Sequence, residues 1–335
     1  MDYLKKNGRK VKKGMKLYNM LLSFGCLFSL LVLLSSCEDS LIIVNDSPQD
    51  NHINICVLGN SYSNDAFSYV PFILKEYGYT CKIEIYYRGS LSLHDLDEQW
   101  YDESQYGLAD LDGEQHIRLH FSIDTRTDQC WRKESVASAE DILSLDKWDI
   151  VSLQQVSSHA QYQETYEPYL KNVIERINAQ CKYPFSLGWF VSYNRAADNA
   201  NQESLDTQKE ICRQYPFNIV IPVAAAVFSC QEHEELAELG DSKYKKMYAS
   251  DNVHMQEGLP CYVAALTVAE TIMQSYFHRD SVIGNSIRPT DKWINSINGI
   301  TPNGSSTGVT EANCALAQRA AVNAYYHKFE IIPLE

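Results

Sequence analysis

Short apolar runs alternate with amphipathic stretches along most of the chain beyond residue 52. The runs that we predict as strands cover 53–58, 81–87, 149–153, 185–190 and 218–221. The stretches that we predict as helices cover 65–77, about 92–101, 165–180 and 201–214. Short apolar strands that alternate with amphipathic helices are typical of a parallel sheet covered on both faces. We therefore predict an α/β fold, a three-layer α/β/α sandwich with a mainly parallel sheet.

Two regions differ from this alternation. Between 102 and 135, polar and apolar residues alternate with period two over 117–121, which predicts an antiparallel β-hairpin inserted at the periphery of the sheet. Beyond the last strand, Pro260 stands in the first turn of a predicted helix over 261–277, where its missing N–H costs little. A further helix is predicted over about 311–327.

The first 36 residues have the pattern of a targeting segment. Basic residues crowd positions 5–16, and an apolar run follows from about 17 to 34. The next residues, Leu-Ser-Ser-Cys at 34–37, resemble the lipobox of bacterial lipoproteins. That resemblance implies a lipid on Cys37. The mostly polar residues that follow predict a tether over 37–51, and the length and apolar content of the remainder predict one domain over 52–335.

The alternative for this segment is a transmembrane helix that stays attached, since about 18 apolar residues can just span a bilayer. Either way, we expect the body of the protein in the cell envelope, anchored outside the cytoplasm.

The chain is strongly acidic, with a formal net charge of −14. Cleavage before Cys37 removes seven basic residues and one acidic residue, which leaves 22 Lys and Arg against 42 Asp and Glu. Such a charge repels phosphate backbones and anionic headgroups. Nucleic acid is therefore excluded as an expected partner, and the lipid anchor is the expected membrane contact.

Eight cysteines follow the predicted lipidation site, and an even number outside the cytoplasm permits disulfides. However, Cys56 and Cys81 fall in strand-like runs. Cys212, Cys261 and Cys314 fall in helical ones. Cysteines in such places behave as small apolar residues, so we favour buried thiols over disulfides. No Cys-x-x-Cys or His-rich spacing indicates a metal, and no organic cofactor is implied.

Candidate catalytic residues follow several predicted strands, and ligands bind open α/β sheets at the carboxyl ends of the strands. Gly59-Asn60-Ser61 follows the first strand, Gly89 the second and Gln154-Gln155 the third, while Asp251 and His254 precede the last large helix. A serine at a strand-to-helix turn can stand clear of the sheet. Its hydroxyl needs a base to become a nucleophile, and His and Asp are the partners of such a serine in a triad.

These four blocks resemble the SGNH/GDSL hydrolase superfamily, specifically a branch of secreted and lipoprotein members whose nucleophile block reads Gly-Asn-Ser. The resemblance covers most of residues 53–276 and implies a flavodoxin-like sheet. It implies that Ser61 is the nucleophile, His254 the base and Asp251 the residue that orients the base.

The resemblance also implies two oxyanion donors. The glycine of the second block, Gly89, would contribute its backbone N–H. The third block of the family ends in an asparagine, whereas this chain has Gln154-Gln155. Related carbohydrate esterases use a glutamine at the equivalent strand end, so the role is assigned to Gln154, with Gln155 as the rival.

We therefore expect a serine esterase that acts through an acyl-enzyme and removes O-acetyl groups from a carbohydrate. Export, the glutamine of the third block and many aromatic residues near the strand ends favour an acylated carbohydrate, or another small ester, as the substrate. One alternative is a lipase-like or lysophospholipase-like esterase, which needs an apolar groove for the acyl chain. The other is a catalytically inactive, glycan-binding lipoprotein.

Overall fold

The computed structural model describes residues 50–101, 116–136, 138–237, 243, 247–279, 281, 287–297, 300 and 308–335. The predicted signal peptide, Cys37 and the tether up to residue 49 lie outside the described residues. The same holds for 102–115, the first part of the segment predicted to contain the hairpin. Among the described residues, no helix is both long and apolar enough to cross a bilayer.

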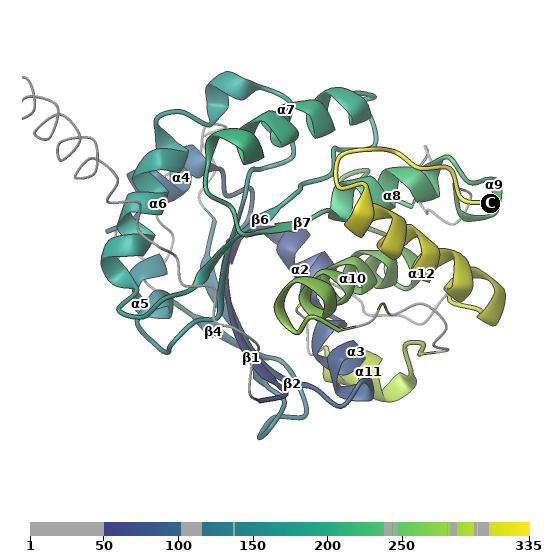
Figure 1. Cartoon of the computed structure of the whole chain (residues 1–335), viewed down its shortest axis with the longest axis horizontal. Coiled ribbons are helices and arrows are strands. Elements are labelled where there is room, and N and C mark those ends of the chain that lie inside the picture. Colours follow the sequence, from purple (N-terminus) through teal and green to yellow (C-terminus); the bar gives the residue numbers. More distant parts are fainter. Residues whose placement is uncertain are drawn as a thin grey trace, which may run out of the picture. The chain divides into compact units, whose positions relative to one another are not determined.

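A sheet with the strand order β4-β3-β2-β1-β5-β6-β7 runs through the described part of the chain (Figure 1). Parallel pairing joins β2, β1, β5, β6 and β7, whereas β3 pairs antiparallel with β2 and with β4. The strands are β1 His52–Gly59, β2 Thr80–Arg88, β3 Arg118–Asp124, β4 Arg132–Ser135, β5 Ile150–Gln154, β6 Ser186–Phe190 and β7 Ile219–Ile221. The predicted α/β class is confirmed, with a mixed sheet whose antiparallel strands β3 and β4 form an edge hairpin.

Helices lie on both sides of this sheet. From one side α5 packs on β1 and β2, and from the other α2 and α3 pack on β2 (Figure 1). The helices are α2 Ser61–Phe67, α3 Val70–Glu76, α4 Leu93–Glu98, α5 Ala139–Leu143, α6 Tyr169–Gln180, α7 Asn201–Gln214, α8 Val223–Gln231, α9 Glu234–Ala237, α10 Leu259–Thr271, α11 Asp291–Ser296 and α12 Glu311–Tyr326. A 3₁₀ turn covers Gln163–Thr165, and a π-helical turn, Ile272–Tyr276, continues α10.

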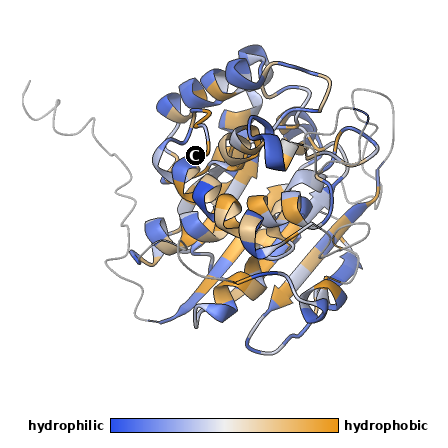
Figure 2. Ribbon diagram, turned by 90° about the vertical axis from the view of Figure 1, so that its right-hand side faces the viewer, coloured by the Kyte–Doolittle hydropathy of each residue, from blue (hydrophilic) through white to orange (hydrophobic). Residues whose placement is uncertain are grey.

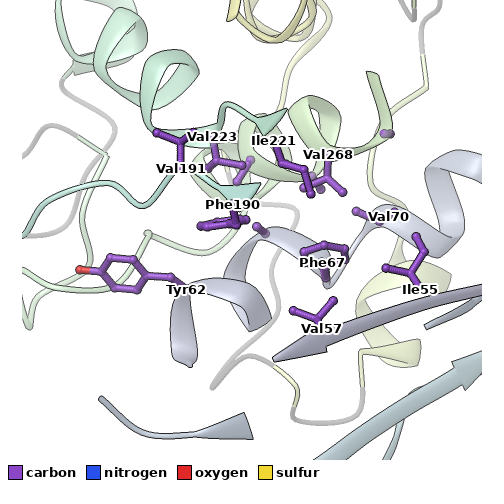
Figure 3. Close-up of a cluster of buried hydrophobic side chains, with 14 of the residues drawn as sticks. Ile55, Val57, Tyr62, Phe67, Val70, Phe190, Val191, Ile221, Val223 and Val268 are labelled. Carbon is purple, nitrogen blue, oxygen red and sulfur yellow. The ribbon is translucent and has the colours of Figure 1, made fainter. Parts of the chain in front are cut away.

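The core lies between the sheet and the helices, and Figure 2 shows hydrophobic residues gathered in the strands and the central helices. One apolar cluster fixes α2 against the sheet (Figure 3). In this cluster Phe67 of α2 lies near Val57 of β1, while Phe190, Ile221 and Val268 approach from β6, β7 and α10. Close packing of this kind leaves the beginning of α2 little freedom relative to β1.

The helix predicted over 65–77 is two helices, and the first begins four residues earlier than predicted. Asn60 caps α2, because its side-chain oxygen accepts the N–H of Tyr62 at 3.1 Å. Pro71 then occupies the first turn of α3, where proline is tolerated only near a helix start. The cap therefore makes Ser61 the first residue of a helix rather than part of a loop.

The cysteines of the described residues are free thiols. Five are buried as predicted, whereas Cys181 and Cys212 are half-buried and Cys130 is exposed. Burial raises the pKa of Cys81 to about 12, which keeps this thiol protonated. Burial also raises the pKa values of Cys56 and Cys261 well above the ordinary value. These cysteines fill the core as small apolar groups.

Candidate active site

The nucleophile candidate, Ser61, stands directly after β1, and Asn60 holds its backbone in place. The side-chain oxygen of Asn60, Oδ1, accepts the backbone N–H of Tyr62 at 3.1 Å and the side-chain N–H of Gln154 at 2.5 Å. Its amide nitrogen donates to the backbone carbonyl of Leu91 at 3.1 Å. One buried side chain thus links the ends of β1 and β5 to the loop after β2.

Gly59 permits this close arrangement because it has no side chain. A Cβ at this position would stand 2.1 Å from Ser63 Oγ and 2.9 Å from Gln154 Oε1. In the native structure, the Ser63 hydroxyl donates to that same Gln154 oxygen. A larger residue where β1 turns into α2 would therefore displace the Ser63 hydroxyl from Gln154.

The base candidate, His254, and its partner Asp251 lie in hydrogen-bond contact. The distance from His254 Nδ1 to Asp251 Oδ2 is 2.6 Å. Because a carboxylate can only accept, Nδ1 carries the hydrogen and Nε2 is the acceptor atom of a neutral ring. The side chains are 33% and 49% exposed, respectively, so this pair is open to a ligand.

The loop of this pair is shaped by Asp251 itself. Its second oxygen accepts the backbone N–H groups of Val253 and His254, at 2.9 and 3.0 Å, and Asn252 takes a left-handed conformation with φ 62°. Partial burial works to raise the pKa of Asp251, but the hydrogen bonds from His254 and Val253 hold it below its ordinary value. Asp251 therefore stays ionised beside the imidazole.

Contacts with α2, the helix that begins at Ser61, hold this loop in place. The N–H of Met255, the residue after His254, donates to Asp65 Oδ2 of α2 at 3.1 Å. The His254 ring also meets the edge of Tyr62, with ring centroids 6.2 Å apart. Among the hydrogen bonds of the described residues, none joins Ser61 to His254. Such bonds are often long without substrate and tighten when it binds.

The two glutamines after β5 are buried and engaged within the protein. Gln154, 4% exposed, donates to Asn60 and accepts from Ser63. Gln155 accepts the Val156 N–H at 2.9 Å and donates to the carbonyl of Thr165 at 3.1 Å. These contacts give both amides a structural role, and the oxyanion role of Gln154, with Gln155 as its rival, stays a prediction.

Gly89 stands immediately after β2, under the ring of His116. A Cβ on Gly89 would approach His116 Nδ1 to 2.9 Å, so a larger residue would displace that ring. The next residue, Ser90, has a positive φ of 55°. The oxyanion role of the Gly89 N–H stays a prediction.

A cavity of about 600 Å³ opens beside these loops. Its wall comes from the loops that follow β2, β5 and β6 and from the loop of His254, which is the expected end of the parallel strands for a ligand. The lining includes Ser90, Ser157, His159, Tyr162, Arg195 and Val253. Hydroxyl groups predominate there, together with an imidazole, a phenol, one guanidinium group and the carboxylates of Asp95 and Glu164, so the cavity suits a polar ligand.

Sequence reasoning missed Asp65 and Tyr193. Asp65 lies four residues after Ser61, a spacing that places both on one face of a helix, and this signal was available. Tyr193 stacks on Tyr62 with ring centroids 3.9 Å apart, and its hydroxyl donates to Asp65. No spacing in the sequence indicates a contact between residues this far apart.

No protein-family model matches the sequence, and no curated protein matches it either. Among solved structures, a DUF4886 family protein from Bacteroides uniformis is similar, with a TM-score of 0.64 and 18% identity over 85% of this chain and 100% of that one. A protein from Slackia heliotrinireducens, described as "a putative SGNH hydrolase", has a TM-score of 0.41 and 17% identity over 66% of this chain and 99% of its own. At 18% identity, the first likeness shows a shared fold, and the chemistry must be argued from the site itself.

Proposed function

We propose that this protein is a serine hydrolase of the SGNH type, with that family's three-layer, flavodoxin-like arrangement, and that it cleaves esters through an acyl-enzyme on Ser61. The observation that carries the proposal is the Asp251–His254 pair, 2.6 Å apart, in a loop bonded to the helix that begins with Ser61. The pairing of a base with an orienting carboxylate, in a loop that contacts the helix of a candidate nucleophile, supports the proposal.

The chemistry needs two acyl transfers. Ser61 Oγ attacks the ester carbonyl carbon while its proton passes to His254 Nε2, and Asp251 stabilises the resulting imidazolium. The carbon–oxygen bond to the sugar then breaks, and the imidazolium returns the proton to the departing hydroxyl. Water attacks the acyl-serine with His254 as base again, and the carboxylic acid and free serine are released.

The oxyanion of each tetrahedral intermediate needs donors. We assign the backbone N–H groups of Gly89 and of Ser61, the latter in the first turn of α2, where a helix leaves its N–H groups without intrahelical acceptors. Removing one such donor typically costs about 3 kcal/mol in the transition state. For Gln154 we propose a supporting place, since its amide holds Asn60 rather than pointing outward.

For the substrate, we propose an O-acetylated carbohydrate. The cavity beside His254 is lined by polar side chains, and Tyr162, 47% exposed, offers a ring on which a sugar can stack. A lipase would need an apolar groove, which these residues do not provide. A lipid on Cys37, a place in the cell envelope and the absence of nucleic-acid partners belong to the same proposal and rest on the sequence.

The test compares three forms of the full chain purified in detergent: wild type, Ser61→Ala, and Ser144→Ala as a control at an exposed serine. We expect wild type and the control to release acetate from acetylated glycans and from nitrophenyl acetate, and Ser61→Ala to be at least a thousandfold slower. Equal rates for wild type and Ser61→Ala would refute the proposal. A strong preference for long acyl chains would favour a lipase, and glycan binding without hydrolysis would favour an inactive lectin.

A further inference from the structure

Asp65 is a buried carboxylate in contact with the residue that follows the base. It is 2% exposed and lies one helical turn after Ser61 on α2. Its Oδ2 accepts the Met255 N–H at 3.1 Å and the Tyr193 hydroxyl at 2.9 Å. Burying an ionised group is costly unless its partners compensate, and a neutral residue often serves packing better. Packing alone therefore does not explain an acid at this position.

The surroundings of Asp65 connect it to His254 by two routes. The first is the backbone, because Met255 directly follows His254. The second is aromatic: Tyr193, which donates to Asp65, stacks on Tyr62 at 3.9 Å with an interplanar angle of 6°, and Tyr62 meets the His254 ring edge-on. We name Asp65, Tyr62, Tyr193 and Met255 the Asp65 cluster. Asp65 is thus connected to His254 both through the backbone and through stacked rings.

We propose that the ionised carboxylate of Asp65 is the positioning group of this site: it holds the loop of His254 onto the helix of Ser61, and its charge favours the imidazolium that forms during attack. This inference rests on the proposed function and extends it to a residue outside the Ser/His/Asp set.

The electrostatics support this role. Burial raises the pKa of Asp65 to about 6, while a charged His254, the Met255 N–H and the Tyr193 hydroxyl act to lower it and Asp251 acts to raise it. The interaction is mutual, so the Asp65 anion in turn stabilises positive charge on His254. The other titratable groups that interact with Asp65 are Tyr62 on its own helix, Tyr87 at the end of β2, Tyr193 after β6 and Cys261 in α10. Burial keeps these neutral.

The test follows Ser61 labelling by an alkyl fluorophosphonate and kcat/KM for nitrophenyl acetate between pH 4.5 and 9, with the full chain in detergent. In wild type both His254 and Asp65 must be deprotonated, so log kcat/KM should fall on the acid side with a slope that approaches 2. Asp65→Asn should reduce this slope to 1 and lower the plateau at least tenfold, without lowering Tm at pH 8.

Tyr193→Phe provides a second variant, because it removes one hydrogen bond to Asp65 but keeps the ring that stacks on Tyr62. The acid limb should move to higher pH with a plateau within about threefold of wild type. Tyr262→Phe is the matched control, since its hydroxyl bonds to the Ile287 carbonyl rather than to the Asp65 cluster. Its profile should be that of wild type.

Two results separate the inference from the proposed function. If wild type is labelled at Ser61 but Asp65→Asn keeps the wild-type slope and plateau, or Tyr193→Phe leaves the acid limb in place, Asp65 is only structural and the inference is overturned. If wild type is neither labelled nor active on esters, the proposed function fails and the inference fails with it.

Discussion

At the scale of single residues, the charge of the buried Asp65 lowers the stability of the folded protein, although the proposed reaction needs it. Its pKa is raised to about 6, so between about pH 4 and 6 the folded state binds more protons than the unfolded state, and stability falls as the pH rises. A shift of this size costs about 3 kcal/mol, fully present above pH 6 and relieved at pH 4. Asp65→Asn should therefore be more stable than wild type at pH 8 and similar to it at pH 4, as measured by urea unfolding.

The control for this prediction is Asp251→Asn, for which the sign is opposite. The folded state lowers the pKa of Asp251, so its charge contributes stability above the ordinary carboxyl pKa, and that stability is lost as the pH falls. The effect should be small because half of the side chain is exposed. A destabilised Asp65→Asn protein at pH 8 would contradict the assignment of a strained, buried charge.

Residue types and local spacing predict the candidate Ser/His/Asp set of this site, but not the contacts between residues far apart in the sequence. Ser61, Asp251 and His254 stand out because few residue types can carry acyl transfer, and Asp251 reaches His254 within one turn of chain. The bond between Gln154 and Asn60 joins residues 94 positions apart, so only the folded sheet reveals it. The sequence therefore indicated Gln154 only as an oxyanion donor, a role that stays a prediction, and gave no sign of its bond to Asn60.

At the scale of elements, the junction of β1 and α2 determines the position of Ser61, the proposed nucleophile. Gly59→Ala would press a Cβ against Ser63 Oγ and Gln154 Oε1, separating two groups that are bonded in the native structure. Overpacking of this kind costs about 1–3 kcal/mol. We expect Gly59→Ala to lower both the free energy of unfolding and kcat, the latter at least tenfold, in urea titrations and ester assays of the same preparation.

A second glycine supplies the control for that experiment. Gly78 has a φ of 81°, and a Cβ there would meet nothing within 4 Å. Gly78→Ala should therefore cost about 1 kcal/mol through backbone strain while leaving kcat unchanged. If Gly59→Ala retains full activity, the tight junction is not needed for the reaction.

Elements with a periodic pattern of polar and apolar residues could be predicted from the sequence. Elements that are buried on all sides have no such pattern and could not. The period-two alternation around Phe121 predicted the edge hairpin, which β3 and β4 form. By contrast, α8 is buried all round, so it shows no amphipathic period and was not predicted. The start of α2 was misplaced because Asn60, a common helix cap, was considered only as part of the nucleophile block.

At the scale of the whole molecule, the alternation of strand-like and helix-like segments along the sequence was enough to predict the α/β class. Strands that alternate with helices can bury both faces only in a layered arrangement, and the pairing from β2 through β1 and β5 to β7 follows that rule. The edge hairpin makes the sheet mixed and places Arg118 opposite Arg88, beside the turn of Gly89. The same sheet end carries the polar cavity.

If the proposed esterase activity is correct, the net charge of the molecule should affect the rate at which charged substrates bind. With a formal charge of −14 for the whole chain, the long-range field repels anionic esters, and salt screens that field within about 10 Å at 0.1 M. We expect kcat/KM for an acetylated uronate to rise several-fold as NaCl increases from about 20 to 500 mM, while kcat/KM for a neutral acetylated sugar stays constant. Arg195 lies in the cavity wall, where it pairs with Asp198 at 3.4 Å and faces a lining that also holds Asp95 and Glu164. Arg195→Gln removes the positive charge of this wall, so it is the control and should steepen the salt dependence for the uronate. If the uronate is instead favoured at low salt in wild type and this preference is lost in Arg195→Gln, the local cation outweighs the net charge, and the substrate of this cavity carries a carboxylate.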